Sequence, residues 1–254
     1  MKKYINLIRF TRNWPNYFYT KYLDKKQEPI HFVGKNNNVK LEVPRELLAI
    51  FKEIYMEDLY ILSFLKERLP NNPKIVDIGA NAGFFTTFVA DHFPQASIYA
   101  FEPLPSNFKQ LKQNCELNPN HHMLANNQAV SGKPGPVTLY YNPENTLTPL
   151  ASTSASFDSR NVQKTEVEAV TVEQIMSEYK LDRIDLLKLD CEGAEYDILY
   201  NTPTQLFDKI DMLTMEVHKG DMPRENLPNL QKFLTDLGYK IRIRGEDFVW
   251  AWKN

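Results

Sequence analysis

Cysteine is scarce in this chain of 254 residues, which contains only Cys115 and Cys191. Two thiols cannot build the disulfide framework of a small secreted protein or a zinc site with several cysteine ligands, and they indicate a reduced, cytoplasmic protein. No segment approaches the roughly 18 to 20 apolar residues that a membrane-spanning helix needs. Arg9 and Arg12 interrupt the apolar stretch behind Met1, so the N-terminus makes a poor secretory signal.

An excess of charge of one sign is also missing, because 30 Lys and Arg face 32 Asp and Glu. A net charge of −2 argues against a dedicated nucleic-acid-binding protein. Residues 1–26 nevertheless carry a net charge of +6 and seven aromatic residues, which leaves −8 for the remainder. Such a basic aromatic arm is typical of contact with an anionic membrane or a partner. We favour the simpler interpretation, a helix that packs on the main domain through its aromatic face.

A cluster of proline and asparagine at residues 70–73 divides the chain into two predicted domains. Residues 1–73 are expected to form an extension made of the basic arm, a short hairpin and one or two helices. Residues 74–254 are expected to form the main domain. A chain that starts near Gln27 should still bind a cofactor if this division is correct.

The main domain alternates between predicted strands and predicted helices with short connections between them. This alternation indicates an α/β fold with a mostly parallel sheet and helices on both faces, and a C-terminal hairpin adds antiparallel strands at one edge. The strands are expected at residues 74–78, 97–101, 123–125, 184–190, 212–217, 239–244 and 248–252, and the helices at 83–92, 106–117, 193–200 and 227–237.

Residues 142–163 break this alternation between two further predicted strands at 137–141 and 166–171. The segment is rich in Ser, Thr, Asn and Pro. Structureless loops of this length are uncommon in compact domains and are often lids or binding loops. A merely mobile insertion is the alternative interpretation.

A glycine-containing turn follows the first strand of the main domain, in the order Gly79-Ala80-Asn81-Ala82-Gly83-Phe84. Glycine between a strand and a helix allows a ligand to approach the backbone at the helix N-terminus. A dinucleotide-binding fingerprint would need glycine at positions 79, 81 and 84, and Asn81 and Phe84 break that pattern. The turn is therefore predicted to bind an adenosine ligand that lacks a diphosphate.

An acidic residue, Glu102, lies at the end of the second strand, 19 residues beyond Gly83. A carboxylate near this position can accept hydrogen bonds from both ribose hydroxyls, and we favour this role over a simple helix cap. Asn127 and Gln128 follow the third strand, where the edge of an adenine would lie. Amide side chains are also ordinary in turns, so both interpretations stay open there.

Several segments together resemble a known family. Val76-Asp77-Ile78-Gly79-x-Asn81-x-Gly83, Phe101-Glu102-Pro103 and Asn127-x-Ala129-Val130-Ser131 are similar to the motifs of class I S-adenosylmethionine-dependent methyltransferases. The later segments Leu187-Lys188-Leu189-Asp190-Cys191-Glu192-Gly193-Ala194-Glu195 and Met215-Glu216-Val217-His218 narrow the resemblance to the FkbM family of methyltransferases. The resemblance covers roughly residues 74–252, and Cys191 stands where an aliphatic residue is expected.

The resemblance implies a seven-stranded, Rossmann-like fold that transfers a methyl group from S-adenosylmethionine. The acceptor in this family is typically a hydroxyl group of a sugar, a polyketide or another natural product. Nine residues would contact the cofactor, in order from its methionine half through the ribose to the adenine. Carried over by position, they are Asp77, Gly79, Asn81, Gly83, Asp190, Glu102, Asn127, Gln128 and Ala129.

Acidic residues at the carboxyl ends of two later strands are predicted to act on the acceptor. Methyl displacement needs mainly alignment, whereas a sugar hydroxyl must also lose a proton to a base or with the help of a metal. Asp190, Glu216 and His218 form the predicted constellation, with Glu192 beside it and His218 as the base near neutral pH. A divalent cation on Asp190 and Glu216 is the alternative, although we expect none because a third ligand is not evident. Glu195 is assigned a structural role at the start of a helix.

A different class of function competes with this one. The chain would then be a membrane- or partner-recruited cofactor-binding protein with little or no catalytic activity. Intact acidic residues at positions 77, 102, 190 and 216 count against a degenerate pocket.

Overall fold

The computed structural model describes residues 2–24, 28–142, 147, 152, 160–218, 220 and 222–253. Its centre is a seven-stranded sheet of five parallel strands with an antiparallel pair at one edge. The strands are β3 (Lys74–Ile78), β4 (Ser97–Phe101), β5 (His122–Asn126), β9 (Leu186–Leu189), β10 (Met212–Glu216), β11 (Lys240–Arg244) and β12 (Phe248–Trp252), in the spatial order β11-β12-β10-β9-β3-β4-β5. The predicted α/β fold with a C-terminal antiparallel hairpin is therefore confirmed.

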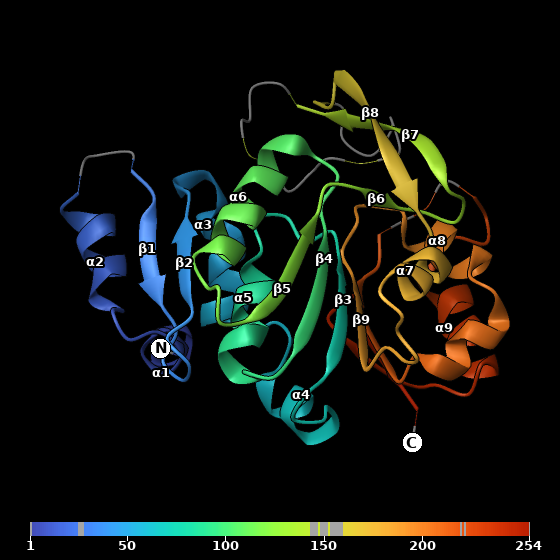
Figure 1. Ribbon diagram of the computed structural model, residues 1–254, viewed down its shortest axis with the longest axis horizontal. Helices are drawn as coiled ribbons and strands as arrows, with labels where there is room; N and C mark the ends of the chain where they lie inside the picture. The colour runs from blue at the N-terminus through green and yellow to red at the C-terminus, as the bar shows by residue number, and fades with distance from the viewer. Residues whose placement is uncertain are drawn as a thin grey trace.

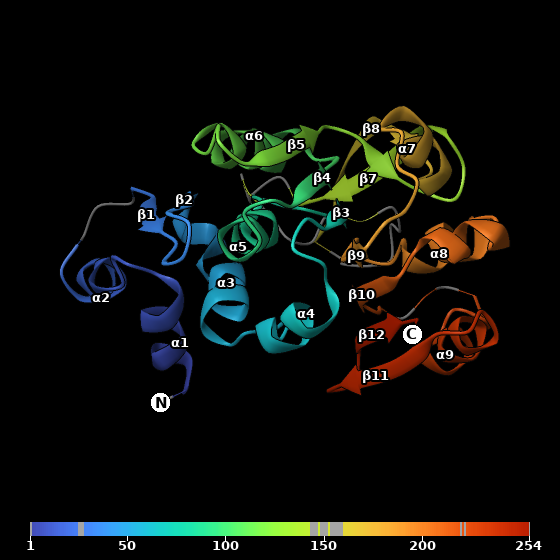
Figure 2. The same ribbon diagram turned by 60° about the horizontal axis from the view of Figure 1, so that its bottom comes forward.

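Helices cover both faces of this sheet (Figure 2). One face is covered by α4 (Leu62–Arg68), α5 (Phe84–His92) and α6 (Pro105–Glu116), and the other by α7 (Val172–Glu178), α8 (Glu195–Asn201) and α9 (Leu227–Asp236). Neighbouring strand residues point to opposite faces, so Ile75 packs in one buried cluster with Phe88 and Val76 in the other with Ile198. Burial on both faces is typical of a parallel sheet.

The N-terminal region packs on the same face as α5. It contains α1 (Lys2–Phe10), α2 (Pro15–Tyr22), the hairpin β1 (Ile30–Val33) and β2 (Lys40–Val43), a 3₁₀ turn η1 (Arg45–Leu47), α3 (Leu48–Phe51) and a π-helical turn η2 (Lys52–Met56). The ring of Phe10 meets the ring of Phe88 edge-on, with 5.2 Å between centroids. Leu7 and Phe10 belong to the same buried cluster as Phe88, as the simpler interpretation of the arm predicted. The division into domains at residue 73 stays a prediction.

Asparagine side chains hold both edges of the β1–β2 hairpin. Asn13 comes from the α1–α2 connection and binds β1, whereas Asn114 of α6 and Asn118, just after that helix, bind β2. Each amide both accepts from and donates to the strand backbone: Asn13 with Val33 and His31, Asn114 with Glu42, and Asn118 with Lys40.

A second, three-stranded sheet lies beside the carboxyl ends of the main strands (Figure 1). Its strands β6 (Ala129–Val130), β7 (Gly135–Tyr141) and β8 (Gln163–Val170) have the order β6-β8-β7. The sequence predicted β7 and β8 but neither β6 nor the helix α7. Most of the insertion at 142–163 lies outside the described residues. In the described part of the chain, no helix has both the length and the apolar character to cross a membrane.

Candidate active site

A cavity of about 280 Å³ opens where the carboxyl ends of the parallel strands meet the small sheet. Gly79 and Asn81 after β3, Glu102 after β4 and Asp190 after β9 line it, and Ala129 of β6 closes one side. In parallel sheets of this type, ligands bind in the crevice at the carboxyl ends of the strands. The structure therefore brings together residues that are 111 positions apart in the sequence.

The glycine turn leaves no room for a side chain at Gly79. Its φ is +73°, and a Cβ atom there would lie 1.8 Å from the backbone oxygen of Asp190. The turn after β3 thus touches the turn after β9. Gly83 also has a positive φ of +80°, and it packs against Leu111 of α6 at the start of α5. Gly83 therefore allows the turn to pack closely against α6.

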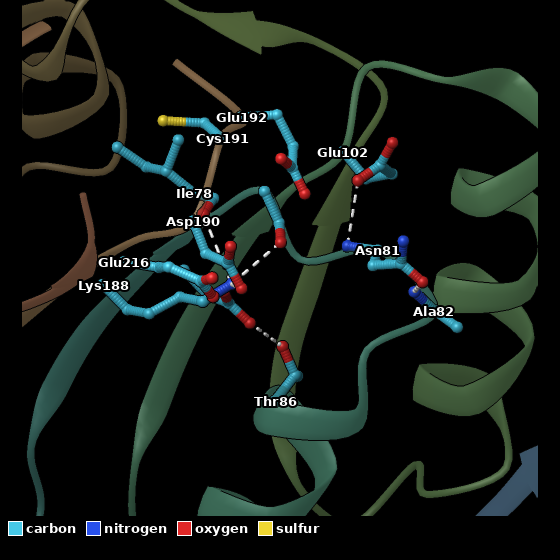
Figure 3. A network of polar contacts seen from close by, with 12 residues as sticks. Ile78, Asn81, Ala82, Thr86, Glu102, Lys188, Asp190, Cys191, Glu192 and Glu216 are labelled. Atoms are coloured by element: carbon cyan, nitrogen blue, oxygen red, sulfur yellow. Dashed lines mark hydrogen bonds and ion pairs between the residues drawn. The ribbon is translucent and has the colours of Figure 1, made fainter. Parts of the chain in front are cut away.

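Glu102 is held rigidly on the cavity wall. Its Oε2 accepts the backbone N–H of Asn81 at 2.9 Å (Figure 3), and its Oε1 accepts the backbone N–H of Leu104 at 2.9 Å. The residue is only 5% exposed. Burial raises its pKa to about 7, although the two N–H groups oppose that shift. The remaining lone pairs of a fixed carboxylate suit a ligand that donates two hydroxyl groups.

Of the three residues predicted to contact the adenine, only Ala129 lines the cavity. Ala129 lies on the cavity wall, next to Val130 and across from Asn107. Asn127 and Gln128 do not belong to that lining. The amide of Asn127 instead donates to the backbone oxygens of Glu102 and Pro103, each at 2.9 Å, and so holds the turn after β4.

A buried lysine supports the glycine turn from below. Lys188 Nζ donates to the backbone oxygen of Gly79 at 2.8 Å and lies 3.0 Å from Asp77 Oδ1 and 3.6 Å from Asp190 Oδ2 (Figure 3). Burial lowers the pKa of Lys188, but the carboxylate of Asp77 and other neighbours outweigh it, so its pKa is raised. Asp77 is fully buried and also accepts from Thr86 Oγ1 at 2.6 Å. Asp77 thus lies one layer beneath the cavity wall.

Four carboxylates gather at the other end of the cavity. Asp190 and Glu192 follow β9, Glu216 ends β10, and Glu53 comes from η2 in the N-terminal region. The first three belong to the constellation that the sequence predicted. Glu53 does not, because nothing in its local pattern distinguishes it from a glutamate on the solvent face of a helix.

His218 lies among these carboxylates. Its Nε2 is 3.2 Å from Glu192 Oε2 and 3.9 Å from Glu216 Oε1, and its Nδ1 is 3.2 Å from Glu195 Oε1. Burial lowers the pKa of His218, but the hydrogen bond to Glu195 and the three negative charges raise it to about 9. The raised pKa favours the positively charged form of His218 near neutral pH, whereas the sequence predicted His218 as the base.

The carboxylates themselves hold protons unusually strongly. Burial raises the pKa of Glu192 to about 8 and that of Glu216 to about 7, and the nearby charge of Asp190 acts in the same direction for both. The buried carboxylate of Glu195 accepts the backbone N–H groups of Cys191 and Gly193, each at 3.1 Å. This contact supports the structural role assigned to Glu195.

Two further segments reach the cavity. Ala49 and Ile50 of α3 line it together with Glu53. From the insertion, the hydroxyl of Ser152 donates to the backbone oxygen of Glu192 at 2.5 Å. Over the described ranges, no group of three or more His, Cys, Asp or Glu residues is arranged to hold a metal ion.

The chain is similar in sequence to known proteins. Residues 77–241 match the model of the methyltransferase FkbM domain. Methyltransferase sdnD of Sordaria araneosa is 31% identical over 233 residues, which cover 81% of this chain and 86% of the relative. The 31-O-demethyl-FK506 methyltransferase FkbM of Streptomyces tacrolimicus is 24% identical over 204 residues, covering 69% and 76%. The hexuronic acid methyltransferase AglP of Haloferax volcanii is 22% identical over 199 residues, covering 74% of each chain.

A solved structure supports the fold. The crystal structure of methyltransferase FkbM from Methylobacillus flagellatus KT superposes with a TM-score of 0.50 and 15% sequence identity. The superposition covers 72% of this chain and 44% of that protein, so the chain spans less than half of the solved structure.

Proposed function

Because the chain belongs to the FkbM methyltransferase family, we propose that it transfers the methyl group of S-adenosylmethionine to a hydroxyl group of a small molecule. The observation that carries this proposal is the single cavity that joins Glu102 at one end to Asp190 and Glu216 at the other. One end suits a nucleoside and the other suits an acceptor that must lose a proton.

The residues at the first end fit the proposed cofactor. Glu102 presents a fixed carboxylate for the ribose hydroxyls, and Phe101, Ala129 and Val130 offer an apolar wall for the adenine ring. Asp190 also lines the cavity, at the second end, and a carboxylate there favours a nearby positively charged group. When bound, S-adenosylmethionine supplies a methyl group that is already activated by a sulfonium.

The residues at the second end fit proton removal from an acceptor hydroxyl. A general base works best when its pKa is near the working pH, and the pKa of Glu216 is raised to about 7. We assign Glu216 as the base and His218 as the adjacent positive charge, which stabilises the carboxylate form of its neighbours. Asp190 and Glu192 then orient the acceptor through hydrogen bonds.

The acceptor class follows from the relatives and from charge. One relative is a hexuronic acid methyltransferase and another acts on a demethylated FK506, so sugars and polyketides are the first candidates. Glu53, Asp190, Glu192 and Glu216 make the acceptor end acidic. Like charges repel in a partly desolvated site, so we expect neutral or cationic hydroxylated acceptors to be preferred over phosphorylated ones.

Transfer of labelled methyl groups to a panel of hydroxylated sugars and polyketides tests this function. Glu216→Gln should lower turnover by about 100-fold or more and leave the affinity for S-adenosylhomocysteine unchanged, because it removes only the base. Glu166→Gln, an exposed change on β8, is the matched control. Full activity in EDTA is expected. Normal turnover of Glu216→Gln would exclude it as the base, and failure of the wild type to bind S-adenosylhomocysteine would refute the cofactor.

A further inference from the structure

Exposed apolar side chains are concentrated at the N-terminal end of the molecule. Ten large hydrophobic residues are exposed in the described part of the chain, and five of them lie within residues 5–23. They are Ile5, Ile8, Tyr19, Tyr22 and Leu23, with 40% to 71% of their surface exposed. Large exposed apolar side chains that are concentrated in one part of a domain indicate a surface for interaction.

Basic residues surround this apolar patch. Lys2, Lys3, Arg9, Arg12 and Lys21 are all exposed, and across the described residues none of them forms an ion pair with a carboxylate. The remainder of the chain after residue 26 carries a net charge of −8. Residues 1–26 therefore have a net positive charge on a chain that is otherwise net negative, and this segment also holds five of the exposed apolar residues.

On both helices, the exposed apolar residues lie on a different face from the buried residues. Ile5, Ile8 and Arg9 are spaced i, i+3 and i+4 on α1, while Leu7 and Phe10 are buried against the main domain. Tyr19, Tyr22 and Leu23 repeat that spacing at the end of α2. Packing of the arm on the domain thus leaves a second, outward face free.

The two helices adjoin each other at one end of the molecule (Figures 1 and 2). The ring of Tyr4 on α1 lies 5.5 Å from the ring of Phe18 on α2 and 6.3 Å from that of Tyr17. Lys21 lies above the ring of Tyr22, 5.1 Å from its centroid. The contacts of Tyr4 pack α1 against α2, so the exposed residues of both helices lie in the same part of the molecule.

We propose that the outer faces of α1 and α2 bind the anionic surface of a lipid bilayer. Aliphatic and tyrosine side chains can enter the interface between headgroups and acyl chains, while lysine and arginine bind acidic headgroups. The acidic remainder of the chain is repelled by the same surface, so the charge distribution orients the protein with this end toward the membrane. A nucleic acid would pair with the basic residues but would leave the aliphatic ones in water. This inference does not depend on the proposed methyl transfer.

Sedimentation with lipid vesicles tests the proposal on the full chain. We expect binding to phosphatidylcholine vesicles that contain about 30 mol% phosphatidylglycerol, little binding to pure phosphatidylcholine, and release as salt rises from about 0.1 M to about 1 M. A Lys2→Ser/Lys3→Ser/Arg9→Ser variant should partition roughly 100-fold more weakly, since each basic residue near an anionic bilayer contributes about fivefold. An Ile5→Ser/Tyr22→Ser/Leu23→Ser variant should also lose binding.

Matched controls keep the test specific. A Lys109→Ser/Lys180→Ser/Lys209→Ser variant removes three exposed lysines elsewhere and should bind vesicles like the wild type. Both N-terminal variants should keep the wild-type circular dichroism spectrum and affinity for S-adenosylhomocysteine, because they alter only outward-facing side chains. Equal binding to both vesicle types, loss of binding in the control variant, or binding of duplex DNA instead of vesicles would overturn the proposal.

Discussion

Replacing Glu102 tests the cofactor site most directly. The carboxylate accepts one backbone N–H on each oxygen, from Asn81 and Leu104, and a hydrogen bond from the side chain of Asn107, and it lines the cavity. Glu102→Ala removes two charge-assisted hydrogen bonds to the ribose and should cost about 2–4 kcal/mol of binding free energy. That loss corresponds to an increase in Kd of roughly 30-fold to several hundred-fold.

Glu102→Gln separates the hydrogen bonds from the bulk of the side chain. The amide nitrogen cannot accept an N–H, so one turn loses its anchor and one ribose hydroxyl loses its acceptor. We expect an increase in Kd of about tenfold. The wild type should also bind about tenfold more weakly at about pH 6 than at about pH 8, because protonation of a group with a pKa of about 7 removes the ionised acceptor. The glutamine variant should lose that part of the pH dependence.

Isothermal titration calorimetry with S-adenosylhomocysteine measures the Kd of Glu102→Ala, the Kd of Glu102→Gln and the pH dependence of the wild-type Kd. Circular dichroism and thermal unfolding of each variant show whether the turns after β3 and β4 keep their structure. A natively folded Glu102→Ala protein with the wild-type Kd would refute the assignment of this carboxylate to the ribose.

Three further predictions concern the frame of the site. Gly79→Ala should destabilise the protein by more than about 3 kcal/mol, because the added Cβ would overlap the backbone oxygen of Asp190 in the turn after β9. Gly238 also has a positive φ but has open space around it, so Gly238→Ala should cost only about 1–2 kcal/mol, and urea unfolding compares the two variants. The melting temperature should fall as pH rises from about 5 to about 9, because the folded state holds protons on Glu192 and His218 that the unfolded chain releases over this range. Scanning fluorimetry measures the melting temperature, and an increase with pH would contradict the prediction. A chain that starts at Gln27 should melt at a lower temperature, since buried side chains of α1 and α2 are lost. Its Kd for S-adenosylhomocysteine should stay within a few-fold of the wild-type value. Loss of binding by a folded truncated chain would show that the arm is part of the pocket.

Local pattern was sufficient for most of the main sheet. The predicted strands at residues 74–78, 97–101 and 248–252 coincide with β3, β4 and β12, because runs of apolar residues bounded by turn residues identify buried strands. One strand of the small sheet, β6, was not predicted, and the reason is physical. This strand has two residues and pairs with β8, about 40 positions later, so no local signal exists for it. The predicted strand at 166–171 ends on Thr171, which in the structure is the N-cap of α7 and forms a capping box with Gln174.

The site residues that were predicted correctly as neighbours are those that the sheet topology brings together. Glu102, Asp190 and Glu216 follow strands, and the carboxyl ends of parallel strands meet at one edge of a sheet. Glu53 reaches the same cavity only through packing of the N-terminal region, which a linear pattern does not encode. The pKa of His218 is raised by three carboxylates, from the turn after β9, the start of α8 and the end of β10, so this shift could not be predicted without the three-dimensional structure.

The asparagine side chains on the β1–β2 hairpin have a consequence for self-association. A two-stranded sheet normally presents two rows of unpaired backbone groups, and such edges recruit strands from other molecules. Asn13 occupies the groups of Val33 and His31 on one edge, and Asn114 occupies those of Glu42 on the other. The hairpin is thereby insulated against strand addition and edge-to-edge aggregation, although it lies at the end of the molecule where another copy can approach.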